Sequence, residues 1–409
     1  MQSLSFARDR VNGWMRENGA RFAVIRQGSR QFSEAPFDPI PNTLSAREFT
    51  LLEQGLIQRI NALNLFLSDI YHHRMILQDG VIPEEFVFAS PDFRPECMNL
   101  TPPKSIYTHI AATDLIRTAD GAWYAMEDSL AVPDGITYPH FARKLLREAD
   151  PEAYAVPGLC DNCGLDILLR QLYRDVVEGN PALEDGIVVL LSEGGDSLTV
   201  FEAQYLASLT GAVVAAADDL IAMDNKIYYR APQGGFQRVS VLHRLSPDRT
   251  LDPLCFDVDS PCGIPHLMEA YCAGNIAILN APGCSVAEDR GLSFFIPQMI
   301  RYYLDEEPLL PGIPSYLPWY PEDREYILGH MDKLFFKDVA SLRRTAAIRG
   351  NTLTEEGREE LIRQIEINID YILLLVKKYH DTHCTDKEVL ITIQKAVDAS
   401  PELRSKKAL

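Results

Sequence analysis

Two acidic residues in one short stretch of this chain have the side chains that a hard metal ion prefers. The stretch, residues 114–130, reads DLIRTADGAWYAMEDSL. Asp120-Gly121 between two runs of strand-forming residues predicts a β-hairpin with a two-residue turn. In that register Asp114 faces Glu127. Directly opposed side chains have Cβ atoms roughly 5 Å apart, and like charges at that distance destabilise a hairpin, so the pairing needs a physical reason.

A bound cation would remove this repulsion. Ser129 lies two residues beyond Glu127 and projects from the same face of the strand, so three oxygen ligands are expected to converge. Mg²⁺ takes one or two carboxylates together with waters and substrate phosphates. The pattern therefore predicts a metal site formed by Asp114, Glu127 and Ser129. The alternative is a solvated hairpin whose acids splay apart or pair with a neighbouring arginine.

Two other short motifs have chemical potential, each with a simpler alternative. Gly194-Gly195 stands between a predicted strand and a predicted helix, where backbone amides can bind phosphate, although a plain strand-to-helix turn has the same sequence. Cys160 and Cys163 have the spacing of a zinc or redox pair, although a loop with two incidental thiols would look the same.

Composition limits the class of protein. The chain has 409 residues, 46% of them hydrophobic, which is enough for a substantial core and two or three domains. A net charge of −19 argues against a protein whose main function is to bind nucleic acid. It does not exclude a local cluster of cations that binds a nucleotide. Eight scattered cysteines are typical of buried thiols in a cytosolic protein. No apolar run approaches the ~20 residues that cross a bilayer, and we expect a cytoplasmic protein.

Helix signals are strong near the start of the chain. Ser45 and Glu48 have the spacing of a capping box, which predicts that a helix begins here. Apolar residues then recur every three or four positions, as expected for one buried stripe, at Leu52, Leu56, Ile60, Leu63, Leu67 and Ile70.

The middle of the chain has the pattern of an α/β unit. The run GIVVLL (186–191) predicts a buried strand, a helical stretch follows to Gly211, and AVVAA (212–216) predicts a second strand. Strand, helix and strand in that order indicate a parallel pair. The runs VSVLHRL, GNIAILNAPG and DKLFFKD predict further short strands.

Beyond residue 349 the pattern becomes helical. Thr352 with Glu355, and Thr385 with Glu388, each have capping-box spacing and precede an amphipathic pattern. We therefore predict a helical unit over residues 350–409.

Several long motifs in order resemble one known family. They are PFDPIP (36–41), GLIQRINALNLFLSDIY (55–71), DGVIP (79–83), EDSLAVPDGITY (127–138), LDPL (251–254), AGNIAILNAPG (273–283) and IRYYLDEEPLLP (300–311). Over about residues 10–340 the chain resembles the circularly permuted ATP-grasp family, relatives of glutathionylspermidine synthase.

The resemblance implies an α/β (α+β) fold, ATP-grasp-like with a parallel-sheet subdomain and followed by the helical C-terminal unit. It also implies an ATP-dependent carboxylate–amine ligase that uses ATP and Mg²⁺ and forms an acyl phosphate. Three sets of residues match the family pattern: Asp114, Glu127 and Ser129 for metal; Arg117, Arg143, Arg244 and Arg290 for catalysis; and Lys337, Asn280 and Arg301 for the nucleotide.

The chain departs from the family pattern at several of these positions. Ser129 and Ala131 replace an asparagine and an arginine, and Arg290 replaces a lysine, which keeps the charge but changes its geometry. The glycine-rich loop expected after Lys337 reads VASLRRTAAIRG, whose bulky side chains prevent the close approach of backbone to phosphate that glycine allows.

The segment over about residues 360–409 is similar to the helical C-terminal region of type I restriction enzyme motor subunits, and the family's own C-terminal ATP-binding portion is expected to be missing. These resemblances divide the chain into an N-terminal helical and hairpin part (1–180), an α/β subdomain (181–345) and the helical unit (350–409).

Three functional hypotheses follow. The first is an ATP-grasp ligase, or a degenerate one, acting on small-molecule or peptide carboxylate and amine substrates. The second is a catalytically inactive scaffold that binds a protein partner, or another copy of itself, through the C-terminal helices. The third, participation in a DNA restriction complex, conflicts with the acidic composition. We expect no membrane partner and no nucleic acid.

Overall fold

The computed structural model describes residues 2–20, 22–26, 29–33, 44–154, 158, 164–193, 199–260, 263–337, 348–363 and 365. The chain forms two compact units, each assembled from separate stretches. Unit 1 comprises residues 1–50, 101–112 and 129–282, and unit 2 comprises residues 51–100, 113–128 and 283–409. The three consecutive domains predicted from the sequence stay a prediction.

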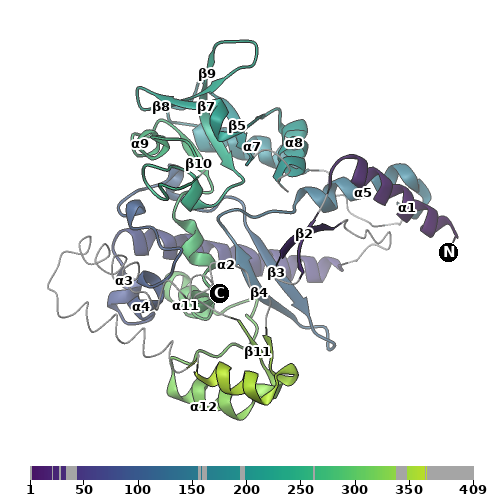
Figure 1. Ribbon diagram of the computed structural model, residues 1–409, viewed down its shortest axis with the longest axis vertical. Helices are drawn as coiled ribbons and strands as arrows, with labels where there is room; N and C mark the ends of the chain where they lie inside the picture. Colours follow the sequence, from purple (N-terminus) through teal and green to yellow (C-terminus); the bar gives the residue numbers. More distant parts are fainter. Residues whose placement is uncertain are drawn as a thin grey trace. The chain divides into compact units, whose positions relative to one another are not determined.

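Unit 1 contains most of the strands (Figure 1). Its helices are α1 (Gln2–Glu17), α5 (Thr137–Ala149), α6 (Pro151–Tyr154), α7 (Leu165–Val177), α8 (Thr199–Thr210) and α9 (Leu267–Cys272). Its strands are β1 (Phe22–Arg26), β2 (Ser29–Ser33), β5 (Ile187–Leu191), β6 (Val213–Ala215), β7 (Leu220–Met223), β8 (Lys226–Arg230), β9 (Phe236–Arg244) and β10 (Ala277–Leu279).

Unit 2 is mainly helical. Its helices are α2 (Ala46–Tyr71, from Leu51 onward), α3 (Met75–Gln78), α4 (Glu84–Phe88), α10 (Arg290–Ser293), α11 (Ile296–Leu304) and α12 (Pro321–Gly329), with one more over residues 355–363. Its strands are β3 (Ala112–Arg117), β4 (Trp123–Ser129), β11 (Phe335–Phe336) and β12 (Ile348–Arg349), although the end residues Ala112 and Ser129 belong to unit 1.

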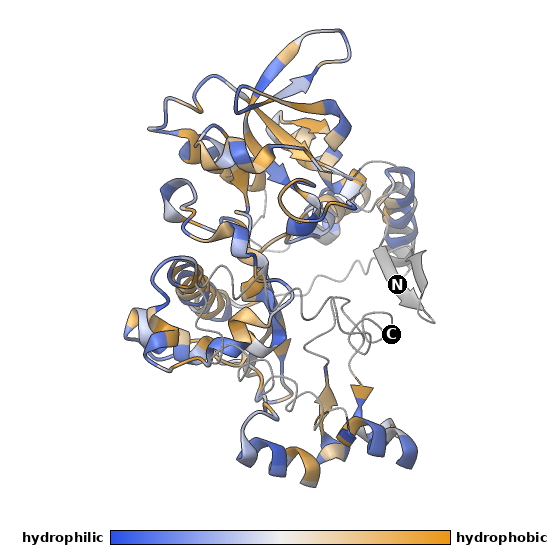
Figure 2. Ribbon diagram, turned by 60° about the vertical axis from the view of Figure 1, so that its left-hand side comes forward, coloured by the Kyte–Doolittle hydropathy of each residue, from blue (hydrophilic) through white to orange (hydrophobic). Residues whose placement is uncertain are grey.

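The six-stranded sheet of unit 1 has the order β6-β5-β9-β8-β7, and β10 pairs with the C-terminal half of β9. β5 runs parallel to β6, as the strand–helix–strand pattern predicted, and it also runs parallel to β9. Figure 2 shows hydrophobic colour along these strands. A parallel sheet is normally covered on both faces, which explains why β5 and β10 are continuous apolar runs. The mixed α/β fold class predicted from the sequence is confirmed.

Helices α7 and α8 pack on this sheet. Leu169 of α7 and Leu206 of α8 share one buried cluster with Leu190 of β5 and with Leu245, which follows β9. Tyr173, one turn further along α7, joins a second cluster with strands β9 and β10. The sheet is therefore covered by α7, which precedes β5, and by α8, which lies in the crossover that joins β5 to β6.

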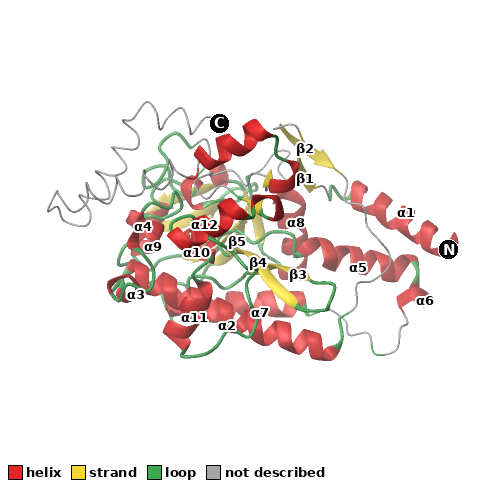
Figure 3. Ribbon diagram, turned by 90° about the horizontal axis from the view of Figure 1, so that it is seen from below, coloured by secondary structure: helices red, strands yellow, loops and turns green. Residues whose placement is uncertain are grey.

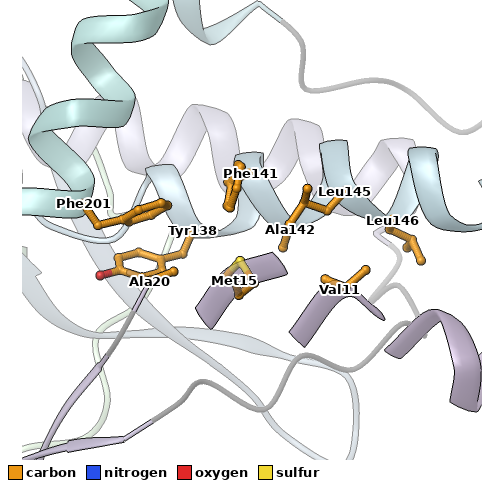
Figure 4. Close-up of a cluster of buried hydrophobic side chains, with 9 residues drawn as sticks. All are labelled: Val11, Met15, Ala20, Tyr138, Phe141, Ala142, Leu145, Leu146 and Phe201. Atoms are coloured by element: carbon orange, nitrogen blue, oxygen red, sulfur yellow. The ribbon is translucent and has the colours of Figure 1, made fainter. Parts of the chain in front are cut away.

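A separate core joins α1 to α5 (Figure 4). Val11 and Met15 are four residues apart on α1 and lie against α5, where Tyr138, Phe141, Ala142, Leu145 and Leu146 form the facing stripe. Phe201 of α8 closes one end of this cluster. The amphipathic period of both helices accounts for the contact, because residues three and four apart share a helical face.

Helix α2 begins where the sequence predicted. The backbone amide of Ser45 donates to Glu48 Oε2 at 2.9 Å and the amide of Glu48 donates to Ser45 Oγ at 3.3 Å, which is a capping box. Along α2 the residues Leu52, Leu63, Leu67 and Ile70 are buried, as expected for the stripe. Leu310 packs closely on α2 at Gly55, where an added Cβ would lie only 2.6 Å from Leu310 Cβ.

The hairpin of β3 and β4 exists, but its turn differs from the prediction (Figure 3). The Thr118 amide donates to the Ala122 carbonyl and the Gly121 amide donates to the Thr118 carbonyl, so the loop has three residues. Gly121 has φ of +90°, as expected for a type I turn followed by a glycine bulge. Thr118 therefore pairs with Ala122, one residue before its predicted partner. The predicted two-residue turn was therefore wrong, while the pairing of Asp114 with Glu127 further along the hairpin stays a prediction.

The C-terminal helix begins two residues later than predicted. Thr354, not Thr352, supplies the cap, because its Oγ1 accepts from the Gly357 amide at 3.1 Å. Five features noted in the sequence lie wholly or partly outside the described residues: the motif at 36–41, the turn at 194–195, the cysteine pair at 160–163, the loop after Lys337 up to residue 347, and most of the segment beyond 363. Among the described residues, no helix is long and apolar enough to cross a membrane.

We predict that Leu63→Ala lowers the free energy of unfolding by about 2 to 5 kcal/mol, because Leu63 is 1% exposed and its truncation leaves a cavity. Leu65→Ala on the same helix is the control, since Leu65 is 43% exposed and its change should be small. Urea denaturation measures both. Equal effects for the two variants would show that the stripe on α2 is not the buried face.

The start of α5 is tied to α8 by a buried carboxylate that should make stability depend on pH. Glu202 accepts from the Gly135 amide at 3.0 Å and from Thr137 Oγ1 at 3.1 Å, and burial raises the pKa of its carboxyl group. The folded chain therefore holds this proton to higher pH than the unfolded chain does, and stability falls as pH rises above about 4.5.

We expect Glu202→Gln, which keeps one acceptor for Gly135, to gain stability relative to the unsubstituted protein as pH is raised from 4 toward 7. Urea midpoints at several pH values measure this difference. Glu178→Gln, at an exposed position, controls for the loss of one negative charge. If the difference in urea midpoint between Glu202→Gln and the unsubstituted protein does not change with pH, the raised pKa of Glu202 is contradicted.

Candidate functional site

Three side chains that the sequence singled out meet in unit 2. Lys337 Nζ forms an ion pair with Glu127 Oε1, and Arg290 Nε lies 3.5 Å from the same oxygen. The three residues come from distant parts of the chain, with Lys337 210 positions beyond Glu127. We call these three residues the Glu127 cluster.

Strand β4 positions Glu127. The backbone of Ala125 is held on one edge by the segment after Leu310, because its amide donates to the Pro311 carbonyl and its carbonyl accepts from the Ile313 amide. Ala125 also packs with Leu52 of α2. Glu127, two residues further, has a side chain that is 27% exposed, so its carboxylate remains partly accessible to solvent and to ligands.

Arg290 is placed by the cap of α10. Asp289 precedes it and accepts from the Gly291 amide at 2.8 Å and from Ser90 Oγ at 2.7 Å. Burial raises the pKa of Asp289, and these hydrogen bonds oppose that rise. A capped first turn fixes the direction in which the Arg290 side chain leaves the helix.

Lys337 directly follows β11, which pairs in antiparallel fashion with β12. The chain is tightly packed beside this ribbon, since a Cβ added at Gly350 would collide with the Met331 carbonyl. The Lys337 side chain is 32% exposed. The strand predicted for the DKLFFKD run is confirmed only at Phe335 and Phe336, since Asp332 and Lys333 lie in a 3-10 turn.

The cluster has the charge distribution of a phosphate site. Two cations surround one carboxylate, which leaves a net positive charge, and both guanidinium and ammonium groups bind phosphate oxygens. One carboxylate with waters and substrate phosphates is also a donor set that Mg²⁺ accepts. The residues present thus fit a magnesium–phosphate ligand, with Glu127 as the protein ligand of the metal.

The other two predicted metal ligands are not part of this cluster. Asp114 lies exposed on β3, and no ion pair joins it to a described residue. Ser129 is the last residue of β4. Within the described ranges no group of three or more His, Cys, Asp or Glu side chains is arranged to hold a metal. Shared ligation of one ion by Asp114, Glu127 and Ser129 stays a prediction.

Two of the predicted site residues are instead deeply buried in unit 1. Arg244 donates from Nε to the Asn280 carbonyl at 2.8 Å and forms a 2.6 Å ion pair with Asp248. The Asn280 side chain accepts from the His109 and Ile110 amides and donates to the Ile110 and Leu130 carbonyls. These contacts join the ends of β9 and β10 to neighbouring loops, which gives both residues a structural role.

The remaining three predicted residues are Arg117, Arg301 and Arg143. The Arg117 guanidinium lies 5.6 Å from the centre of the Trp123 ring across the hairpin. Arg301, on α11, pairs with Glu307 at 2.9 Å, and both are largely exposed. Arg143 lies half-buried on α5 in unit 1. Their predicted roles in binding phosphate or in catalysis stay untested.

Sequence reasoning missed a buried pair directly beside the cluster. Arg59 of α2 donates from Nε and Nη2 to the carboxylate of Asp128, which follows Glu127. One signal was available, because Arg59 occupies a position three residues after Leu56 and four before Leu63, inside the apolar stripe of α2. A charged residue in a buried stripe indicates a buried partner.

Comparison with known proteins supports the resemblance found in the sequence. The model of the family described as circularly permuted ATP-grasp type 2 matches residues 41–385. The match continues past residue 340, so the prediction that the resemblance ends there was wrong. The expected similarity of the segment 360–409 to restriction enzyme subunits is not confirmed.

Curated relatives are longer than this chain. An uncharacterized protein of Synechocystis is 36% identical over 351 residues, which cover 86% of this chain and 72% of that protein. An uncharacterized protein of Mycobacterium bovis is 36% identical over 78% of this chain and 58% of its own length. A Frankia casuarinae protein named "Putative glutamate–cysteine ligase 2-2" is 33% identical over 81% of this chain but only 38% of its own length.

We predict that Asn280→Ala lowers the free energy of unfolding by more than about 3 kcal/mol, because it leaves several buried backbone groups without partners. Asn275→Ala, which removes a single exposed side-chain bond to the Asn225 carbonyl, is the matched control and should change the urea midpoint little. An Asn280→Ala protein as stable as the control would return Asn280 to the set of candidate ligand-binding residues.

Proposed function

Because the chain belongs to the circularly permuted ATP-grasp type 2 family, we propose that it is an ATP-dependent ligase that joins a carboxylate to an amine. In the proposed reaction a carboxylate oxygen attacks the γ-phosphorus of ATP, and ADP leaves with the electrons of the broken P–O bond. The amine nitrogen then attacks the acyl carbon, loses a proton, and phosphate leaves. The products are an amide, ADP and phosphate.

One observation carries this proposal: Glu127, Arg290 and Lys337 meet although they lie on β4, on α10 and after β11. Each of the three matches or conservatively replaces a position of the family pattern. Their convergence in one cluster supports the view that the residues for phosphate binding are retained.

The chain's own residues would act by binding and neutralising charge. Lys337 and Arg290 would bind phosphate oxygens and stabilise the negative charge that develops during transfer. Glu127 would hold Mg²⁺, which supplies further neutralisation of the phosphates when bound. Since Glu127 pairs with both cations in this structure, ligand binding would exchange these contacts for contacts to the metal and to the phosphates.

The proposal gives the chemical class of the substrates and does not name individual compounds. Small-molecule or peptide carboxylates and amines fit the chemistry, and the name of the Frankia relative is compatible with an amino-acid ligase. The finer relation to glutathionylspermidine synthase, the use of ATP and Mg²⁺, and a cytoplasmic location are part of this proposal.

A second candidate is a catalytically inactive scaffold. It is favoured by the pairing of Glu127 with Lys337 and Arg290, because this pairing satisfies the carboxylate without a metal ion. It is also favoured by the non-glycine residues in the loop sequence that follows Lys337.

Calorimetric titration of MgATP into the full chain separates the two candidates. We expect binding by the unsubstituted protein and at least tenfold weaker binding by Glu127→Gln. Glu322→Gln, which removes an exposed carboxylate at the start of α12, should bind as the unsubstituted protein does. Absence of binding to the unsubstituted protein would reject the ligase and leave the scaffold.

A further inference from the structure

The residue after Glu127 forms the most completely buried ion pair in the described part of unit 2. Arg59 Nη2 donates to Asp128 Oδ2 at 2.7 Å, and Arg59 Nε donates to Oδ1 at 2.9 Å. The two side chains are 3% and 2% exposed. Thr113 Oγ1 of β3 donates a further bond of 2.8 Å to Asp128 Oδ1. One carboxylate therefore ties α2, β3 and β4 together.

A buried pair of this kind is not explained by stability alone. Removing two charges from water is costly, and well-packed apolar residues of similar volume often give an equally stable or more stable fold. What an ion pair adds is directional specificity, because a two-point guanidinium–carboxylate contact forms in one alignment only. The alignment that it selects here is that of β4 on α2.

That alignment decides where Glu127 points. Successive side chains of a strand project to opposite faces, so Asp128 turns toward α2 while Glu127 turns toward Arg290 and Lys337. A slip of one residue would exchange the two acids. Two contacts hold β4 in place on either side of Glu127. The backbone of Ala125, two residues before Glu127, is hydrogen-bonded to the 311–313 segment, and the side chain of Asp128, one residue after Glu127, is bound by Arg59.

We infer that Arg59 and Asp128 are positioning residues for Glu127: their buried pair sets the register of β4 and thereby holds the Glu127 carboxylate against Lys337 and Arg290. The importance of this for ligand binding rests on the proposed function. The effect on the Glu127–Lys337 contact does not, and it can be measured without nucleotide.

The test uses the double variant Arg59→Leu/Asp128→Leu in the full chain. It removes both charges while keeping side chains of comparable bulk, so the protein should fold with a urea midpoint close to that of the unsubstituted protein. The first readout is acetylation of Lys337 by a succinimidyl acetate, followed by mass spectrometry and compared with Lys333, an exposed lysine nearby. The Lys337 amine must leave Glu127 before it can attack the reagent.

We expect Lys337 to be acetylated several-fold faster in the double variant, at a rate approaching that of Glu127→Gln, with no change at Lys333. The second readout is MgATP affinity by calorimetry, which should fall at least tenfold. The double variant Glu360→Gln/Arg363→Gln, which removes an exposed ion pair of unit 2, is the control and should change neither readout.

The outcomes are distinguishable. A folded double variant with the Lys337 reactivity and the MgATP affinity of the unsubstituted protein would overturn the inference, since the pair would then serve packing only. If the unsubstituted protein does not bind MgATP, the proposed function fails while Lys337 acetylation still decides the positioning role. If the double variant does not fold, Asp128→Asn replaces it, because this change keeps an acceptor for Arg59. We expect this variant to show a partial rise in the rate of Lys337 acetylation. An unchanged rate would count against the inference.

Discussion

The contact between Arg59 and Asp128 is the constraint on which the described arrangement of unit 2 depends most directly. It joins α2, the longest helix among the described residues, to the strand that carries Glu127, and Thr113 extends it to the other strand of the hairpin. Apolar packing of Ala125 against Leu52 could be satisfied by several small shifts of the strand. A two-point contact between planar charged groups is satisfied by one position, which is why a polar pair can specify what an apolar surface cannot.

In the Glu127 cluster one carboxylate holds two cations close together. Lysine and arginine side chains repel each other, and a carboxylate between them allows both to occupy the same small region of a partly exposed surface. If the Glu127 carboxylate bound a metal ion in place of Lys337 and Arg290, these two cations would become available to bind phosphate. The same three residues can therefore be stable together and still be suited to a ligand of opposite charge.

Prediction from the sequence was most reliable where the signal was local. The capping box at Ser45 and Glu48 marks a real helix start, and the apolar runs in residues 186–216 form the parallel pair β5 and β6. It failed where two local solutions were close in energy. Asp120-Gly121 suits a two-residue turn as well as a three-residue loop with a glycine bulge, and the chain adopts the second. The choice of Thr352 over Thr354 as a helix cap failed for the same reason, since both threonines precede the same helix.

By itself the sequence determined the family, the α/β class and the types of residue that could bind phosphate and metal, because composition, periodicity and motif order are properties of the chain alone. Only the tertiary structure decided how those residues are used. It buries Arg244 and Asn280 in backbone contacts, brings Lys337 and Arg290 to Glu127, and pairs Arg59 with Asp128. The physical reason is that charge pairing and burial act between groups that are neighbours in space, and partners that lie from 69 to 210 positions apart leave no local pattern to read.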